Sequence, residues 1–219
     1  TMGSYEILGI RFAQFVKTDI DFRYYVNFNK SSKLVYRTAL GVGVPMANLK
    51  QALPFEKSFY VGGSNGLRAF RARSIGPGNF YDTTTTFDKT GDILMEGNIE
   101  YRFDLLKIVK GALFYDVGNV WLIKQQEGGR EQGHITSNFY KQLAMGAGIG
   151  LRVDLDFFLF RFDFAYPLRQ PGLPDGEKWF FQEKTITNQW LASYAENNGT
   201  NFVPFKSKLI LNIGIGYPF

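Results

Sequence analysis

The sequence of 219 residues contains no cysteine, a single histidine and no apolar run long enough to form a transmembrane helix, which requires about 18 consecutive residues. The absence of cysteine excludes disulfides and thiolate metal sites. His134 lies in a segment rich in glycine and glutamine, and nucleophile–base catalysis usually places a histidine beside serine or aspartate. A lone histidine in such a segment is more often solvated than catalytic.

Charge is also modest, since charged residues make up 21% of the chain and the net charge is +5. Acidic and basic residues are interleaved, and no basic block indicates nucleic-acid binding. Aromatic residues, in contrast, reach 17%, with 22 Phe and 12 Tyr, and there are 24 glycines. This composition suits a β-barrel in which rings contact lipid and glycines permit close backbone packing.

The final segment, residues 209–219, alternates strictly between apolar and small or polar side chains. One face carries Leu209, Leu211, Ile213, Ile215, Tyr217 and Phe219, and the other carries Asn212, Gly214 and Gly216. An apolar face of this length is typical of a lipid-facing strand in a transmembrane barrel. An edge strand of a soluble sandwich is the alternative.

The same period of two recurs in six further segments, which predicts seven strands over residues 16–28, 34–44, 93–103, 112–121, 143–154, 158–166 and 209–219. The apolar faces, which in the fourth segment include Leu113 and Trp121, are predicted to contact lipid. They carry no charge, as expected where an Arg or Lys at the bilayer midplane costs about 2–4 kcal/mol. A soluble antiparallel sheet also alternates. It would, however, bury all the phenylalanine rings in one sandwich and expose the glycine-rich faces, so the barrel is favoured.

The connections between these strands alternate between short and long. Tight joins are predicted at 29–32, 104–107 and 154–156, and long connections at 45–92, 122–140 and 168–206. Outer-membrane barrels show this alternation between periplasmic turns and extracellular loops, which predicts a periplasmic C-terminus. Single-chain bacterial barrels have an even number of strands, at least eight. We therefore expect an all-β fold in which residues 1–219 form the C-terminal portion of one antiparallel transmembrane β-barrel domain. No secretory signal opens the chain, which is expected to be mature, truncated or cut from a longer protein.

Five ordered motifs resemble the BamA/TamA superfamily of outer-membrane assembly barrels, also called bacterial surface antigens. They are Phe59-Tyr-Val-Gly-Gly-Ser-Asn-Gly-Leu-Arg-Ala-Phe70 with Ile75-Gly-Pro-Gly78, then Glu100-Tyr-Arg-Phe103, Phe114-Tyr-Asp-Val-Gly-Asn-Val-Trp121, Phe164-Ala-Tyr-Pro-Leu168 and Leu211-Asn-Ile-Gly214. The resemblance covers about residues 11–219 and implies a sixteen-stranded barrel. The motif spacing resembles a Bacteroidetes-type, TamA-like member.

The resemblance also implies that residues 47–91 form a long extracellular loop that folds back into the barrel lumen. In such a loop lock, Arg68 would meet the carboxylates of Glu100 and Asp116, with Phe70 and Phe114 beside it and the loop glycines Gly62 and Gly63 at its turn. A guanidinium that forks to carboxylates forms charge-assisted, geometrically specific bonds. The alternative is a solvated loop arginine. Ala69 replaces the central glycine of the family motif, and an alanine would be strained if that position required a positive φ.

At the level of function, the resemblance implies a bacterial outer-membrane barrel that assembles, inserts or translocates other outer-membrane proteins. It implies no enzyme activity, no cofactor, no metal and no nucleic acid. The implied partners are outer-membrane lipid, the assembly machinery, client proteins, and periplasmic or lipoprotein subunits. The alternative is a surface porin or receptor barrel subunit that binds ligands through its long extracellular loops.

The C-terminal segment is expected to act as an assembly signal. An unfolded strand can add to an exposed sheet edge through main-chain bonds, while its alternate side chains fill pockets. A slip by one residue would turn every lipid-facing side chain inward, so a terminal aromatic ring would fix the register. The predicted signal residues are Leu211, Ile213, Ile215, Tyr217 and Phe219.

Overall fold

The computed structural model describes residues 6–7, 10–11, 13–46, 53–80, 89–124, 131–155, 157–173, 176–181 and 208–219. Seven antiparallel strands form one sheet in chain order: β3 (Gln14–Asn29), β4 (Ser32–Met46), β5 (Ile93–Asp104), β6 (Val109–Trp121), β7 (Ala144–Asp154), β8 (Leu159–Arg169) and β9 (Ile210–Ile215). The predicted all-β antiparallel fold is thus confirmed, with all seven strands present.

Smaller elements accompany this sheet. The short strands β1 (Glu6–Ile7) and β2 (Ile10–Arg11) pair with each other, and the 3-10 helices are η1 (Phe55–Lys57), η2 (Glu131–Gly133) and η3 (Phe139–Gln142). None of the helices in the described part of the chain has the length and apolar character needed to cross a bilayer.

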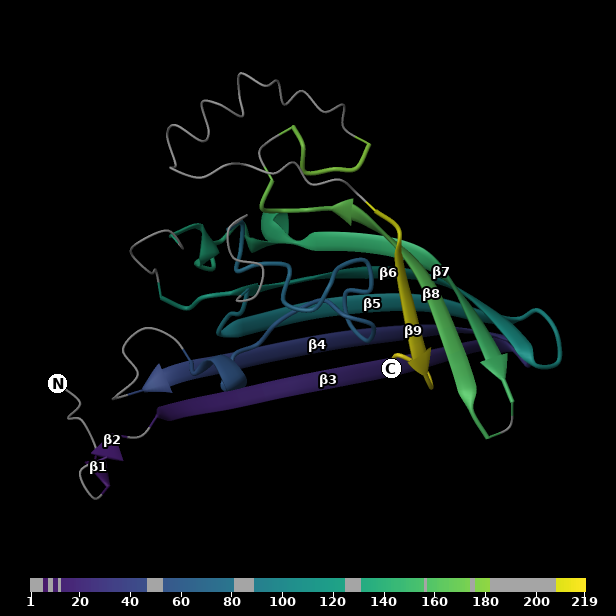
Figure 1. Ribbon diagram of the computed structural model, residues 1–219, viewed down its shortest axis with the longest axis horizontal. Coiled ribbons are helices and arrows are strands. Elements are labelled where there is room, and N and C mark those ends of the chain that lie inside the picture. Colours follow the sequence, from purple (N-terminus) through teal and green to yellow (C-terminus); the bar gives the residue numbers. More distant parts are fainter. Residues whose placement is uncertain are drawn as a thin grey trace.

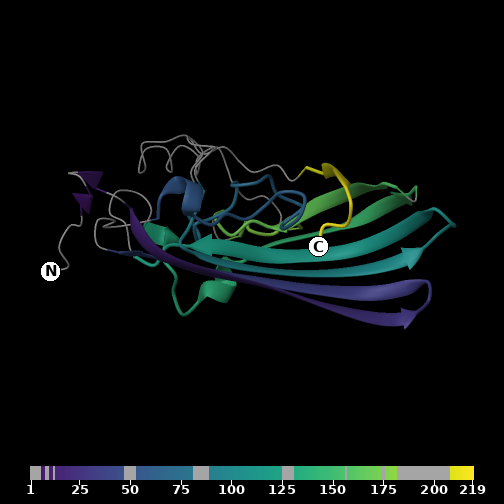
Figure 2. The same cartoon turned by 90° about the horizontal axis from the view of Figure 1, so that it is seen from below.

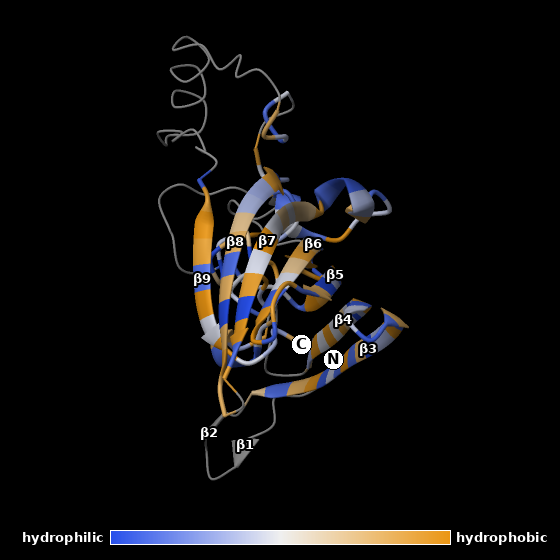
Figure 3. Ribbon diagram, turned by 90° about the vertical axis from the view of Figure 1, so that its right-hand side faces the viewer, coloured by the Kyte–Doolittle hydropathy of each residue, from blue (hydrophilic) through white to orange (hydrophobic). Residues whose placement is uncertain are grey.

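The sheet is curved, and the segment 53–80 between β4 and β5 lies on its concave side (Figures 1 and 2). Side chains point alternately to the two faces, as the pleat of a strand requires. The convex face exposes large apolar side chains, including Ile20, Phe22, Ile99, Leu113 and Ile149. Alternating apolar and polar bands along the strands are visible in Figure 3. The convex face therefore has the character of a lipid-contacting wall.

The register brings the polar residues of neighbouring strands together on the concave face. In β5 and β6, Asn98 lies opposite Asp116. In β7 and β8, Arg152 lies opposite Arg161. Side chains directly opposite each other in an antiparallel pair lie close enough to interact. A continuous band of buried charge therefore crosses β5 to β8.

Two side chains that were predicted to face lipid are buried instead. β9 ends at Ile215, where the strand was expected to continue to Phe219, and Phe219 is only 6% exposed. Gly216 has a φ of 84° and Pro218 lacks an N–H, so the chain leaves the sheet and turns toward the concave side. Trp121 is fully buried because η3 covers it, with its indole N–H donating to Gln142 Oε1 at 2.5 Å.

Candidate functional site

The segment from Phe59 to Phe70 forms a tight turn that depends on its glycines. The N–H of Gly63 donates to the carbonyl of Phe70 at 2.8 Å, and the N–H of Arg73 donates to that of Val61 at 3.0 Å. Gly62 has a φ of 95°, and a Cβ there would lie 2.2 Å from the carbonyl oxygen of Arg71. Glycine is therefore required at this position for both backbone conformation and space.

Apolar side chains of this segment pack on the concave face of the sheet. Phe70 is 3% exposed and belongs to one buried cluster that joins the loop to strands β6 to β8. The cluster comprises Phe59, Val61, Leu67, Ala69, Phe70, Ile75, Phe114, Val120, Ala144 and Ala165. Burial of this apolar surface drives the loop onto the sheet.

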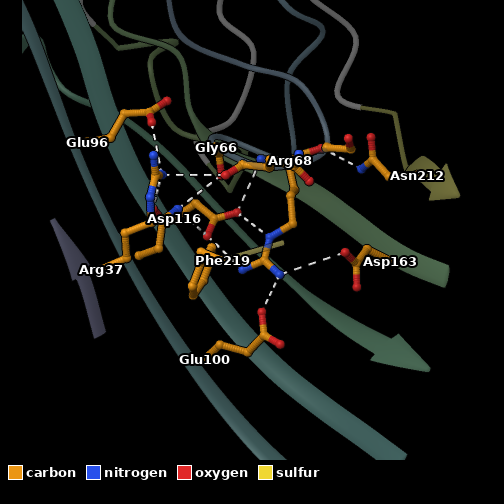
Figure 4. Close-up of polar contacts among 12 residues, drawn as sticks. Arg37, Gly66, Arg68, Glu96, Glu100, Asp116, Asp163, Asn212 and Phe219 are labelled. Carbon is orange, nitrogen blue, oxygen red and sulfur yellow. Dashed lines mark hydrogen bonds and ion pairs between the residues drawn. The ribbon is translucent and has the colours of Figure 1, made fainter. Parts of the chain in front are cut away.

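Arg68 lies at the centre of the site and is fully buried (Figure 4). Its Nε and Nη2 donate to the two carboxylate oxygens of Asp116 at 2.9 and 2.8 Å, and its Nη1 donates to Glu100 Oε2 at 2.5 Å. Its backbone N–H also donates to Asp116 Oδ2 at 3.1 Å. The guanidinium thus forks to both carboxylates that the family motif pairs with it, and the bidentate contact with Asp116 fixes its orientation.

Burial by itself would lower the pKa of the Arg68 guanidinium. The nearby carboxylates of Asp116, Glu100 and Asp163 outweigh this effect and raise that pKa above its ordinary value. The side chain therefore remains charged inside the sheet. A face of the guanidinium also lies over the ring of Phe114, 3.6 Å from its centroid, which adds a cation–π contact.

The acidic partners of Arg68 are themselves held by a second layer of arginines. Arg102 Nε and Arg152 Nη2 donate to Glu100 Oε1 at 2.8 and 3.0 Å. Arg152 Nη1 also lies 2.7 Å from Asp163 Oδ1, and Arg161 Nε lies 3.2 Å from Asp163 Oδ2. Each of these two carboxylates therefore links several arginines, and the charges form a network instead of isolated pairs.

Side-chain alternation places Arg102, Arg152, Arg161 and Asp163 on the polar face of their strands, but the sequence did not assign these four residues to the site. The missing information was the strand register, which sets Arg152 opposite Arg161 across β7 and β8. Like charges directly opposite each other are destabilising unless an acid lies between them. Asp163 supplies that acid two residues further along β8.

Arg161 and one further arginine, Arg37, hold the tip of the loop from opposite parts of the sheet. Arg161 Nη2 in β8 donates to the carbonyl of Ser64 at 3.1 Å and to Asn65 Oδ1 at 2.9 Å. Arg37 Nη1 in β4 donates to the carbonyl of Asn65 at 3.4 Å. The side-chain amide of Asn212 in β9 donates to the carbonyl of Arg68 at 2.9 Å. The loop is therefore tied to strands from β4 to β9.

The last residue of the sequence contacts the charged residues around Arg68. Arg102 Nη2 donates to the main-chain oxygen of Phe219 at 3.1 Å. The Phe219 ring lies 5.5 Å from the Arg68 guanidinium carbon and 5.6 Å from that of Arg102. Of the predicted signal residues, Leu211, Ile213 and Ile215 stay on the exposed convex row. Tyr217 does not face lipid as predicted, because its ring lies 4.4 Å from the Arg102 guanidinium carbon. The chain following β9 thus contacts the loop site from the inside.

Further contacts fix the two ends of the loop. The carboxylate of Asp92 accepts hydrogen bonds from the backbone N–H of Leu53 at 3.3 Å and from that of Ile123 at 3.2 Å. The side-chain amide of Asn119 donates to the carbonyl of Gly78 at 2.9 Å. The sequence analysis assigned neither residue to the site: Asp92 lies outside the motifs, and Asn119 lies within the motif of residues 114–121 without a role being given to it. Residues 47–52 and 81–88 of the predicted loop lie outside the described part of the chain.

The single histidine does not join this site. His134 forms an isolated bridge with Leu122 at the start of the β6–β7 connection. Within the described residues, no group of three or more His, Cys, Asp or Glu side chains is arranged to hold a metal ion.

Alanine replaces the motif glycine at position 69 without backbone strain. Among the described residues other than glycine, positive φ occurs only at Arg73. The Ala69 methyl instead requires a glycine across from it: a Cβ at Gly146 would lie 2.4 Å from Ala69 Cβ. The space between residues 69 and 146 therefore holds one methyl group, which Ala69 supplies and for which Gly146 leaves room.

This complementarity predicts a reciprocal exchange. Gly146→Ala alone should destabilise the loop by about 1–3 kcal/mol, because overpacking in a closed site forces backbone shifts. Adding Ala69→Gly should recover most of that loss. Protease protection of the loop in the full-length folded protein measures the effect, with Val44→Ile, which adds one carbon on the exposed convex face, as the control. Additive losses in the double variant would contradict the proposed fit.

Comparison with known proteins identifies the family of the chain and its fold. The family model of the Omp85 superfamily domain matches residues 5–184. The crystal structure of BamA from Haemophilus ducreyi lacking POTRA domains 1-3 has a similar fold, with a TM-score of 0.56 and 20% sequence identity. The match covers 72% of this chain and 32% of that chain, so the chain spans well under half of that BamA structure. No curated protein matches the chain. From the extent of the family match, the chain belongs to the Omp85 superfamily.

Proposed function

We propose that this chain forms the C-terminal part of an outer-membrane β-barrel that assembles, inserts or translocates other outer-membrane proteins. The observation that carries the proposal is the fully buried Arg68, bound to Asp116 and Glu100 and tied through its loop to strands across the sheet. Membership of the Omp85 superfamily and the fold shared with BamA support it. The role is non-catalytic and needs no cofactor.

In this proposal the loop braces the barrel wall. Strand β9 has only six residues, and its pairing with β8 extends from Ile210 to Ile215. A short strand offers few main-chain bonds, so the wall near it depends more on other contacts. The loop provides these contacts, since Asn212 of β9 and Arg161 of β8 both bind it. A braced wall beside a weakly paired strand provides a sheet edge to which a client strand can add by main-chain bonding.

The orientation follows from the connection lengths. The tight turns after β3, β5 and β7 would face the periplasm, together with the end of the chain after β9, and residues 47–91 would be an extracellular loop folded inward. The partners would be client outer-membrane proteins, the assembly machinery, and periplasmic or lipoprotein subunits. A porin or receptor that captures ligands with exposed loops is less well supported, because the loop turn at Arg68 is buried in the sheet.

The loop lock predicts a loss of assembly when Arg68 is changed. In cells depleted of the wild-type protein, full-length Arg68→Ala should lower the levels of outer-membrane proteins, because breaking a buried ion pair costs about 3–5 kcal/mol. Arg68→Lys, which keeps the charge but cannot fork, should be intermediate. The exposed Arg71 in the same loop gives the matched control, Arg71→Ala, which should behave as wild type.

The level of each variant in the outer membrane is measured in parallel to separate activity from folding. Normal assembly of outer-membrane proteins by Arg68→Ala at wild-type abundance would overturn the proposed role of the loop.

We also propose that the C-terminal segment serves as the signal by which the assembly machinery captures this chain. The exposed row of Leu211, Ile213 and Ile215 is available for pockets of a receptor sheet. Tyr217 and Phe219 would be presented in the unfolded chain before Phe219 turns inward in the folded one. Capture would then precede the burial of the terminal ring.

Replacement of Phe219 should therefore affect insertion and stability differently. Phe219→Ala in the full-length protein should lower the fraction inserted in cells strongly. The folded barrel should lose the burial of one ring and its contacts with Arg68 and Arg102, about 3–5 kcal/mol, and should remain folded. Heat-modifiable mobility of membrane fractions measures insertion, and denaturant unfolding of the purified barrel measures stability. Equal insertion of variant and wild type would remove the basis for the signal.

A further inference from the structure

Two neighbouring turns at one end of the sheet expose large apolar side chains. These turns join β5 to β6 and β7 to β8, and they lie on the same side of the sheet (Figure 1). We call their exposed apolar residues the apolar rim: Leu105, Leu106, Ile108, Leu155, Phe157 and Phe158. Leu106 is 69% exposed and Phe157 is 91% exposed.

The two turns are fixed against each other. The N–H of Asp154 donates to the carbonyl of Ile108 at 2.8 Å, and Lys110 Nζ forms an ion pair with Asp154 Oδ2 at 2.8 Å. The six apolar side chains therefore lie together at one end of the sheet, at the turns of strands β5 to β8. The third tight turn, between β3 and β4, differs because it carries Lys30 and Ser31 in place of large apolar residues.

An apolar surface of this kind is costly in water. Exposure of a leucine or phenylalanine side chain forfeits about 1.5–3 kcal/mol relative to its burial. Contiguous exposed apolar patches usually mark a surface that another phase or molecule covers. We therefore expect another phase or molecule to cover the apolar rim.

The rim is continuous with the convex wall of the sheet. The Phe158 ring lies 6.4 Å from the ring of Phe160, which begins the outward row of β8. In a superfamily of membrane barrels that row contacts lipid. The lipid that covers the convex wall is thus positioned to cover the apolar rim as well.

Two charged residues interrupt the apolar sequence of these turns, Asp156 between Leu155 and Phe157, and Lys107. Lys107 is exposed between Leu106 and Ile108 in the β5–β6 turn. Lysine side chains bury their aliphatic stem and extend their ammonium group to an interface. Anionic phospholipid headgroups attract such a group. Apolar side chains interrupted by a lysine match the boundary between acyl chains and headgroups.

We propose that the apolar rim is embedded in the headgroup–acyl boundary of a phospholipid leaflet, while the β3–β4 turn remains in water. The rim thereby anchors the end of strands β5 to β8, the strands that carry Glu100, Asp116 and Asp163 of the loop site. The inference holds for either leaflet and does not depend on the proposed assembly activity. In the orientation proposed above, the leaflet is the periplasmic one.

Fluorescence quenching of single labels in the full-length protein tests the proposal. This chain contains no cysteine, and any cysteine elsewhere in the full-length protein is first replaced by serine. Leu106→Cys and Phe157→Cys report on the rim, Ser31→Cys on the polar turn and Leu113→Cys on the convex wall. Each variant carries an environment-sensitive label and is reconstituted without other proteins. The vesicles contain phosphatidylethanolamine and phosphatidylglycerol, with or without lipids brominated near the top of the acyl chain.

Labels at 106 and 157 should be quenched by brominated lipid as strongly as the label at 113, and several-fold less by aqueous iodide than the label at 31. Iodide quenching at 106 and 157 equal to that at 31 would overturn the proposal and leave the rim open for a protein partner. A second measurement uses Lys107→Gln with the label at 157. Removal of phosphatidylglycerol from the vesicles should reduce lipid quenching of the label at 157. The reduction should be smaller with Lys107→Gln than with Lys107 present, and an equal reduction would contradict the role of Lys107.

Discussion

The structure depends on a charged guanidinium that has no contact with water. Arg68 is fully buried, and a buried ion costs several kcal/mol unless its partners replace its hydration. Asp116 satisfies two of its nitrogens and Glu100 a third. These contacts determine where the loop lies, because withdrawal of Arg68 would leave Asp116 without its arginine and Glu100 with only Arg102 and Arg152. The position of the loop is thus coupled to the charges on β5 and β6.

The surrounding charges make this coupling a property of the whole concave face. Four arginines and three acids form the buried network: Arg68, Arg102, Arg152, Arg161, Glu100, Asp116 and Asp163. Glu100 and Asp163 are each within ion-pair distance of three arginines, so removal of one member leaves others uncompensated. Strands β5 to β8 contribute members, and the loop contributes the central one. Cooperativity of this kind supports a fixed curvature of the wall.

Much of the fold followed from side-chain alternation, because a period of two assigns each residue to a face before any pairing is known. The contact of Arg68 with Glu100 and Asp116 came from the family motif. The arginines around Asp163 did not, since their proximity depends on the register between β7 and β8. Phe219 was placed on the wrong face because Gly216 ends the alternation. Trp121 was misplaced because η3, which covers it, lies in a connection without periodicity.

Amide hydrogen exchange on the full-length membrane-embedded protein tests the central claim most directly. If Arg68 holds the loop inside the sheet, the N–H groups of Gly63, Arg68 and Phe70 should exchange as slowly as those of β5 and β6, since each donates to a protein acceptor. Asp116→Asn should accelerate exchange in residues 61–73 and leave the strands protected. Exchange of these loop amides in the wild-type protein at the rate of unstructured residues would contradict the account.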